Sequence, residues 1–169
     1  MVDKQTVQNK IPDIFWTVIS MGCGLLFMHF GNKIIVQQGY AALVPPHAAS
    51  LVIAVSGNND PYKMGAGYLV SGAAAYGILQ AVGDNFLPDF GGSRALMVAC
   101  ACAGMKVLDC VHPPAAAYAM SLADVAPMRS LGPKFIAYPG FLGVCLVYVA
   151  AFIAINVRSV LTEGKLKTA

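Results

Sequence analysis

The sequence predicts an all-α membrane protein with four transmembrane helices and two re-entrant half-helices, arranged as two parallel repeats. Three observations lead to this prediction. Of the 169 residues, 57% are hydrophobic and 11% are charged, whereas soluble domains carry about 25% charged residues. The mean hydropathy is +0.65, which is typical of integral membrane proteins. Two short apolar segments each contain a proline pair, and the sequences around these pairs resemble each other.

Composition also argues against several functional classes. The net charge of +3 forms no basic stripe, so nucleic acid is not expected as a partner. Five cysteines, an odd number lying in apolar runs, do not indicate a disulfide scaffold. No nucleophile–base pair, phosphate loop or carboxylate dyad is evident, so we expect neither an enzyme nor a cofactor or metal.

Four apolar runs are long enough to approach the roughly 20 residues that a bilayer crossing needs. The first is extendable to residue 36, the third contains Lys106 and Asp109, and the fourth has Pro139 near its start. The runs are 14–30, 64–82, 95–111 and 135–157. We therefore expect a polar segment, one membrane domain and a polar tail, with bounds 1–13, 14–160 and 161–169.

Two further apolar runs are too short to cross. Residues 41–56 contain Pro45-Pro46, and residues 113–123 begin with Pro113-Pro114. Proline suits the first turn of a helix, where its missing N–H is no loss, and the residue before a proline prefers extended backbone. Roughly 11 helical residues reach about halfway through a membrane. Each proline pair therefore predicts a half-helix that re-enters.

The two proline segments align with each other. Placing Pro45 on Pro113 brings Pro46 onto Pro114, and it also superimposes alanines that follow: Ala48 on Ala116 and Ala49 on Ala117. The same offset carries the second run roughly onto the fourth. We therefore expect repeats at about 14–82 and 92–157, and with two full crossings each they would be parallel.

The half-helices suggest a site for an anion. Helix N-termini inside a membrane protein present free N–H groups and a positive dipole end, and discontinuous helices in transporters bind anions in this way. The residues expected at this site are the prolines and the small residues after them: Pro45, Pro46, His47, Ala48 and Ala49, and Pro113, Pro114, Ala115, Ala116 and Ala117.

Ionisable residues in the apolar runs add candidates. Lys106 lies inside the third run, and Asp109, one helical turn on, is its expected partner; alternatively Lys106 extends to the membrane surface. His112, before the second proline pair, could donate to an anion or carry a proton, or shape the break. Lys33 is a weaker candidate because it could mark the end of the first run.

The segment CVHPPAAAYAMS resembles the signature of the HPP family of small integral membrane proteins. LVPPHAASLVIAV followed by PYKMGAGYLVSGAAA is similar to that family's first block, and AYPGFLGVCLVYVAAF to its last span. The resemblance implies a four-span membrane protein and, through plastid and cyanobacterial relatives, an association with nitrite transport. The family has Phe-Gly after the first prolines and a glycine after HPP, where this chain has His47-Ala48 and three alanines.

We therefore expect a membrane channel or transporter for a small monovalent anion, with nitrite the best candidate. The alternatives are a pore for a small neutral solute such as ammonia or urea, and a scaffold or sensor that transports nothing. The expected partners are the lipid bilayer, a small inorganic anion and further copies of the chain in a homo-oligomer. The expected location is a bacterial inner membrane with both termini in the cytoplasm, because basic residues weakly favour that side.

Overall fold

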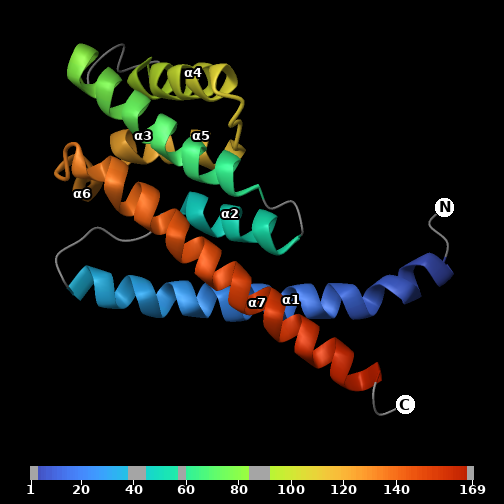
Figure 1. Cartoon of the computed structure of the whole chain (residues 1–169). Helices are drawn as coiled ribbons and strands as arrows, with labels where there is room; N and C mark the ends of the chain where they lie inside the picture. Colours follow the sequence, from blue (N-terminus) through green and yellow to red (C-terminus); the bar gives the residue numbers. More distant parts are fainter. Residues whose placement is uncertain (1–3, 38–44, 57–59, 84–91, 167–169) are drawn as a thin grey trace.

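The computed structural model describes the backbone of residues 4–37, 45–56, 60–83 and 92–166, and most side chains between residues 15 and 157 in these ranges. Every element within them is a helix, which confirms the all-α class (Figure 1). The elements are α1 (Lys4–Gln37), α2 (Pro45–Val55), α3 (Pro61–Val82), α4 (Gly92–Val107), α5 (Pro113–Asp124), α6 (Ala126–Arg129), η2 (Ile136–Phe141) and α7 (Leu142–Leu166).

The helix starts follow local chemistry. Proline occupies the first helical position of α2, α3 and α5, where its fixed φ suits the helix. At α3 the Asp60 side chain also accepts a hydrogen bond from the Lys63 amide at 3.2 Å, which caps the helix. The two proline-pair segments therefore form short helices as predicted, each beginning at the first proline of its pair.

The predicted long runs also correspond to helices, although their bounds differ. α1 begins ten residues before the run predicted from residue 14, and α4 ends at Val107 rather than at residue 111. Among the described residues, one helical stretch, Ile136–Val157, is both long and apolar enough to cross a membrane, with a mean hydropathy of 2.3. The number of spans thus stays a prediction.

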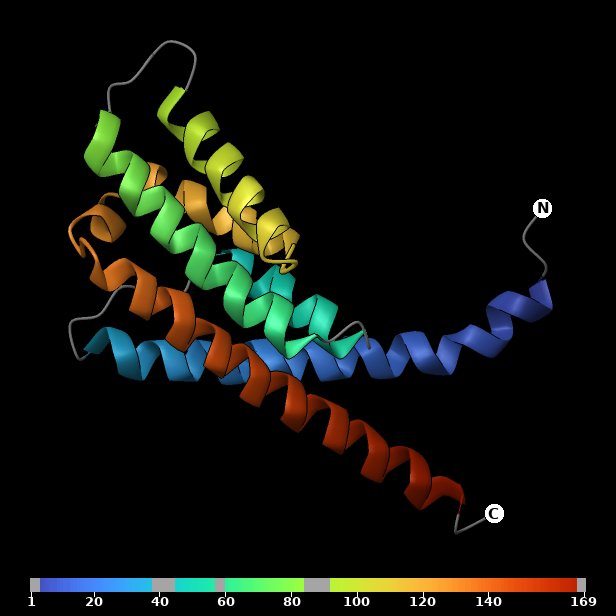
Figure 2. The same ribbon diagram turned by 45° about the horizontal axis from the view of Figure 1, so that its top comes forward.

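The long helices pack in two groups around the short ones. α3 packs against α4 and α5, whereas α7 packs against α1 and α2, and α2 contacts α5 between the two groups. Figure 2 shows the same arrangement from a second direction. Large apolar side chains remain exposed on the outer helices, among them Leu26, Phe30, Val107 and Phe152. Such an apolar surface suits contact with lipid.

The direction of the helices corrects the expected topology. α1 and α3 run broadly opposite to α4 and α7 in both views, so the two units are not parallel. α1 ends at one end of the bundle and α3 begins at the other, with α2 running toward the start of α3; α5 likewise runs from the end of α4 toward the start of α7. The re-entrant character of the short helices and the number of passes in each unit stay predictions.

Candidate functional site

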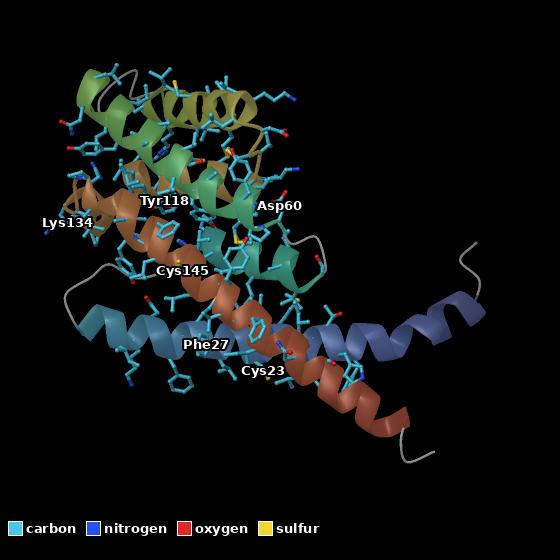
Figure 3. All side chains as sticks on the ribbon, viewed as in Figure 1. Cys23, Phe27, Asp60, Tyr118, Lys134 and Cys145 are labelled. Atoms are coloured by element: carbon cyan, nitrogen blue, oxygen red, sulfur yellow. The ribbon has the colours of Figure 1, made fainter. Side chains whose placement is uncertain are left out.

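A cluster of polar side chains lies buried where the two short helices meet α3. His47 and Ser50 come from α2, Tyr68 from α3, and His112 and Tyr118 from the start and middle of α5. His47, Ser50, Tyr68 and Tyr118 are fully buried, and His112 is 6% exposed. We call these residues the polar cluster. Figure 3 shows Tyr118 in the interior, between Asp60 at one end of the bundle and Lys134 at the other.

Ser50 is the centre of the cluster. Its Oγ lies 2.9 Å from His112 Nε2, 3.0 Å from the Tyr68 hydroxyl and 3.1 Å from the carbonyl oxygen of Pro46. A hydroxyl donates one hydrogen bond and accepts two. Ser50 can therefore satisfy all three neighbours only if it donates to one of them and accepts from the other two.

The position of the Ser50 proton is coupled to the state of His112. If His112 carries a proton on Nε2, it donates to Ser50, which then donates to the Pro46 carbonyl while Tyr68 donates to Ser50. If His112 Nε2 is unprotonated, Ser50 can donate to it instead, and the Pro46 carbonyl loses that donor. The cluster thus has two hydrogen-bonded arrangements, and the presence or absence of a proton on Nε2 of His112 selects between them.

His47 connects α2 to the bend before α7. Its Nε2 lies 3.0 Å from the Pro139 carbonyl oxygen; since a carbonyl only accepts, Nε2 carries the proton. The imidazole also contacts two aromatic rings, with centroid distances of 4.9 Å to Tyr68 and 5.7 Å to Tyr118. These contacts hold the imidazole on a defined tautomer and orientation.

Tyr118 supplies a hydrogen bond that the backbone lacks at the same bend. In a regular helix the carbonyl of Phe135 would accept from the amide of residue 139, but Pro139 has no N–H, and Tyr138 has non-helical φ and ψ of −145° and 129°. The Tyr118 hydroxyl donates to the Phe135 carbonyl instead, and the two rings stack with centroids 4.4 Å apart. The break at Pro139 is therefore compensated by a side chain from α5.

Tyr118→Phe is expected to destabilise the protein by about 1–3 kcal/mol, because it leaves the buried Phe135 carbonyl without this donor. The measurement is the free energy of unfolding in detergent, by thermal or chemical denaturation. Tyr62→Phe is the matched control, since the exposed Tyr62 hydroxyl donates to the carbonyl of Leu108, which water can replace. Equal stabilities of the two variants would contradict the assigned role of Tyr118.

Gly67 of α3 lets the start of α5 approach closely. A Cβ atom at this position would lie 3.0 Å from His112 Cβ and 3.1 Å from the Cys110 carbonyl oxygen, whereas Gly65 faces open space. The absence of a side chain at Gly67 thus sets how near His112 comes to α3, and hence to Tyr68.

Gly67→Ala should be less stable than Gly65→Ala by about 1–3 kcal/mol, because overpacking at the α3–α5 contact opposes the gain in helix propensity that both variants share. Unfolding in detergent measures the difference. A Gly67→Ala variant as stable as Gly65→Ala would show that α5 can move away without loss.

A cavity of about 320 Å³ adjoins the cluster at the start of α3 and α5. Asp60, which caps α3, and Lys63 in its first turn line the cavity and form an ion pair at 3.7 Å. His112 lines it from the other side, next to Val111 and Pro113. His112 therefore borders the cavity and, through Nε2, is bonded to Ser50 in the interior. Within the described ranges, no group of three or more His, Cys, Asp or Glu residues is placed to hold a metal ion.

The amides expected to bind an anion at α5 are occupied. Pro113 and Pro114 have no N–H, and the amides of Ala115 and Ala116 both donate to the His112 carbonyl, at 2.9 and 3.4 Å. None of these four residues in the first turn of α5 thus has a free N–H group for an anion. At α2, Pro45 and Pro46 likewise lack N–H groups, Pro46 is buried, Ala48 is half-buried and Ala49 is exposed.

The charged candidates lie apart from the cluster. Lys106 is exposed in the last turn of α4, and Asp109 is exposed beyond the helix with φ of 50°. The Asp109 amide donates to the Lys106 carbonyl at 3.3 Å just after α4 ends, but no ion pair joins the two side chains among the described residues. Lys33 is exposed near the end of α1. Of the predicted site residues, the structure brings together His47, His112 and the Pro46 carbonyl at the polar cluster, with Pro113 beside His112 in the cavity wall.

Sequence reasoning missed Ser50, Tyr68, Tyr118 and the ion pair of Asp60 with Lys63. A usable signal exists for the first three, because each is a hydroxyl residue within a strongly apolar segment, and polar groups buried in a membrane need a partner. Asp60 and Lys63 lie in a segment whose composition indicates a turn. That composition does not show that the turn borders a cavity.

One known family matches the chain: the HPP transmembrane region, over residues 6–162. No curated protein and no solved structure matches it. The match covers both short helices and every residue of the polar cluster.

Proposed function

Because the chain belongs to the HPP transmembrane family and is therefore a membrane protein, we propose that it forms a pathway for a small monovalent anion, with nitrite the best candidate. The observation that carries this proposal is the polar cluster, in which His47, Ser50 and His112 of the two short helices meet beside a cavity. Polar and ionisable groups inside a membrane domain are costly and mark solute pathways. The proposed role is passage of a solute, not catalysis.

The binding groups proposed for the anion differ from those at a free helix N-terminus. His112 borders the cavity, and Lys63 is a lysine in the cavity wall, so these side chains are the donors within reach of a solute there. The α5 dipole still points its positive end at this cavity, because α5 begins at Pro113. The anion would thus meet His112 and Lys63 before it reaches Ser50.

An inverted repeat would suit this role. If residues 14–82 and 92–157 are related units, their opposite directions make the repeat inverted. The packing of α3 on α4 and α5 then corresponds to that of α7 on α1 and α2. Transporters with inverted repeats bind their substrates near the bilayer midplane, between discontinuous helices. The polar cluster lies between two such short helices, α2 and α5, and the cavity opens beside it at the start of α3.

The proposed setting is a multi-pass protein of a bacterial inner membrane with cytoplasmic termini. α1 begins, α3 begins and α7 ends at one end of the bundle, where Lys63 and Lys106 also lie, and basic residues favour the cytoplasmic side. A homo-oligomer remains part of the proposal. Gly65 and Gly77 of α3 face open space, which leaves room for a helix of a neighbouring copy.

The experiment is nitrite uptake into proteoliposomes that contain the purified protein, with empty liposomes as the baseline and chloride as competitor. Saturable uptake above the baseline is expected. His112→Gln should lower uptake by at least about tenfold, equivalent to roughly 1.4 kcal/mol, whereas Lys106→Met should keep it within about twofold because Lys106 lies outside the cavity lining. If Lys106→Met lowered nitrite uptake more than His112→Gln, the result would indicate that the anion site includes Lys106 and not His112.

A pore for a small neutral solute is the second candidate. It is favoured by one observation: the described side chains of the polar cluster carry no fixed charge, and hydroxyl and imidazole groups also bind neutral solutes. Swelling of the same proteoliposomes in urea or ammonia, without nitrite uptake, would select this function. No flux of any of these solutes would leave a scaffold or sensor in which the cluster is a packed structural element.

A further inference from the structure

The cavity beside His112 has the size of a small hydrated ion. Its volume is about 320 Å³, whereas one water occupies about 30 Å³. A triatomic anion with several waters therefore fits. The cavity lies against the first turn of α3 and the start of α5, so its walls combine an ion pair with an imidazole.

The charges in the cavity wall determine what it can bind. Asp60 and Lys63 lie 3.7 Å apart and cancel each other's charge. Among the residues that line the cavity, His112 is the one whose ordinary pKa lies near neutrality. With His112 neutral the lining has no net charge, and with His112 protonated it has a charge of plus one, which matches a monovalent anion.

The other groups around His112 do not supply this charge. Ser50 of α2 and Tyr68 of α3 lie on its inner side, and Cys110 precedes it by two residues. Serine does not titrate, and tyrosine and cysteine are neutral near pH 7. His47 lies beyond Tyr68 and donates to the Pro139 carbonyl. Lys106 and Asp109 are exposed outside the cavity lining.

We propose that this cavity binds a small monovalent anion together with one proton, which His112 holds. The inference rests on the proposed anion pathway and adds the coupling of the anion to a proton. The cluster can accommodate the protonated form: Nε2 donates to Ser50, Ser50 to the Pro46 carbonyl, and Tyr68 to Ser50. The remaining ring N–H, on Nδ1, has no hydrogen-bond partner among the described residues and is available to the anion.

The test is calorimetric titration of the purified full-length protein with sodium nitrite, in pairs of buffers that differ in ionisation enthalpy. The number of protons taken up per bound anion follows from the difference between buffers. For the wild type we expect about one proton per nitrite, and a nitrite Kd that rises about tenfold per pH unit once His112 is neutral.

Asp60→Asn separates this mechanism from others. The amide keeps the ability to cap α3 but removes the negative charge, so Lys63 alone makes the cavity positive. We expect this variant to bind nitrite with nearly no proton uptake and a Kd that changes by less than about twofold with pH. His112→Gln should bind weakly at every pH. Asp124→Asn, which loses the ion pair with Arg94 away from the cavity, should keep the wild-type dependence.

Three results would overturn the proposal: no nitrite binding at any pH, a wild-type proton number near zero, or an Asp60→Asn variant with the wild-type pH dependence. The binding titration and the uptake measurement test different claims, so their outcomes can be told apart. Proton-linked nitrite binding without uptake would refute the transport function and leave the site. Saturable nitrite uptake together with nitrite binding that does not depend on pH would refute the proton on His112, but it would still support the transport function.

Discussion

Ser50→Ala is expected to lower stability and solute uptake together, because Ser50 is the shared partner of three polar groups. Its Oγ contacts His112 Nε2, the Tyr68 hydroxyl and the Pro46 carbonyl. Losing one buried partner costs about 1–3 kcal/mol. Tyr68 and His112 both lose one here, so a total of about 2–6 kcal/mol is expected from the two groups.

The consequence for function follows from geometry. Without the Ser50 hydroxyl, nothing in the cluster fixes Nε2 of His112, so the imidazole can rotate at the cavity wall. Nitrite uptake by Ser50→Ala is expected to fall at least about tenfold, since donors in a site act only when they are held in position. Thermal denaturation in detergent and uptake into proteoliposomes measure the two effects on the same preparation.

Ser56→Ala is the matched control for this variant. Ser56 lies at the end of the same helix, and its hydroxyl donates to the Ile53 carbonyl at 2.9 Å, but it is exposed. Water replaces that bond, so a change within about 0.5 kcal/mol is expected. If Ser50→Ala behaved like Ser56→Ala in both measurements, Ser50 would not be the centre of the site.

The elements that could be predicted from the sequence are those with local causes. Helices begin at Pro45 and Pro113 because proline at the first position needs neither its own N–H nor a free φ. The apolar character of residues 136–157 likewise needs no knowledge of neighbours. The choice of His47 and His112 as candidates used the same local reasoning, since both adjoin a proline pair.

The parts of the fold and of the site that could not be predicted depend on contacts between distant segments. Ser50 and His112 meet because α2 packs against α5, and no spacing in the chain encodes that contact. The prediction of parallel repeats assumed that each short helix returns to the side it entered. In Figure 1, α2 runs toward the start of α3 and α5 toward the start of α7, and the two units run in opposite directions. The sequence favours Lys106 over Lys63 because Lys106 interrupts an apolar run, whereas a position beside a cavity is a property of the fold.

His47→Phe is the second variant with a large expected effect. Phenylalanine keeps an aromatic ring against Tyr68 and Tyr118, but the donor to the Pro139 carbonyl is lost. We expect a loss of about 1–3 kcal/mol in the free energy of unfolding. The bond joins α2 to the bend at the start of α7, so uptake should fall at least about tenfold as that bend loses its fixed position.

His47→Gln separates the hydrogen bond from the shape of the ring. The amide of glutamine can donate to the Pro139 carbonyl, so this variant should recover part of the stability that His47→Phe loses. His29→Phe is the control, since His29 is exposed on α1 and contacts the adjacent Phe30. If uptake were lost in His47→Gln as fully as in His47→Phe while stability recovered, the imidazole itself would act on the solute. The binding site would then extend from the cavity past Tyr68 to His47.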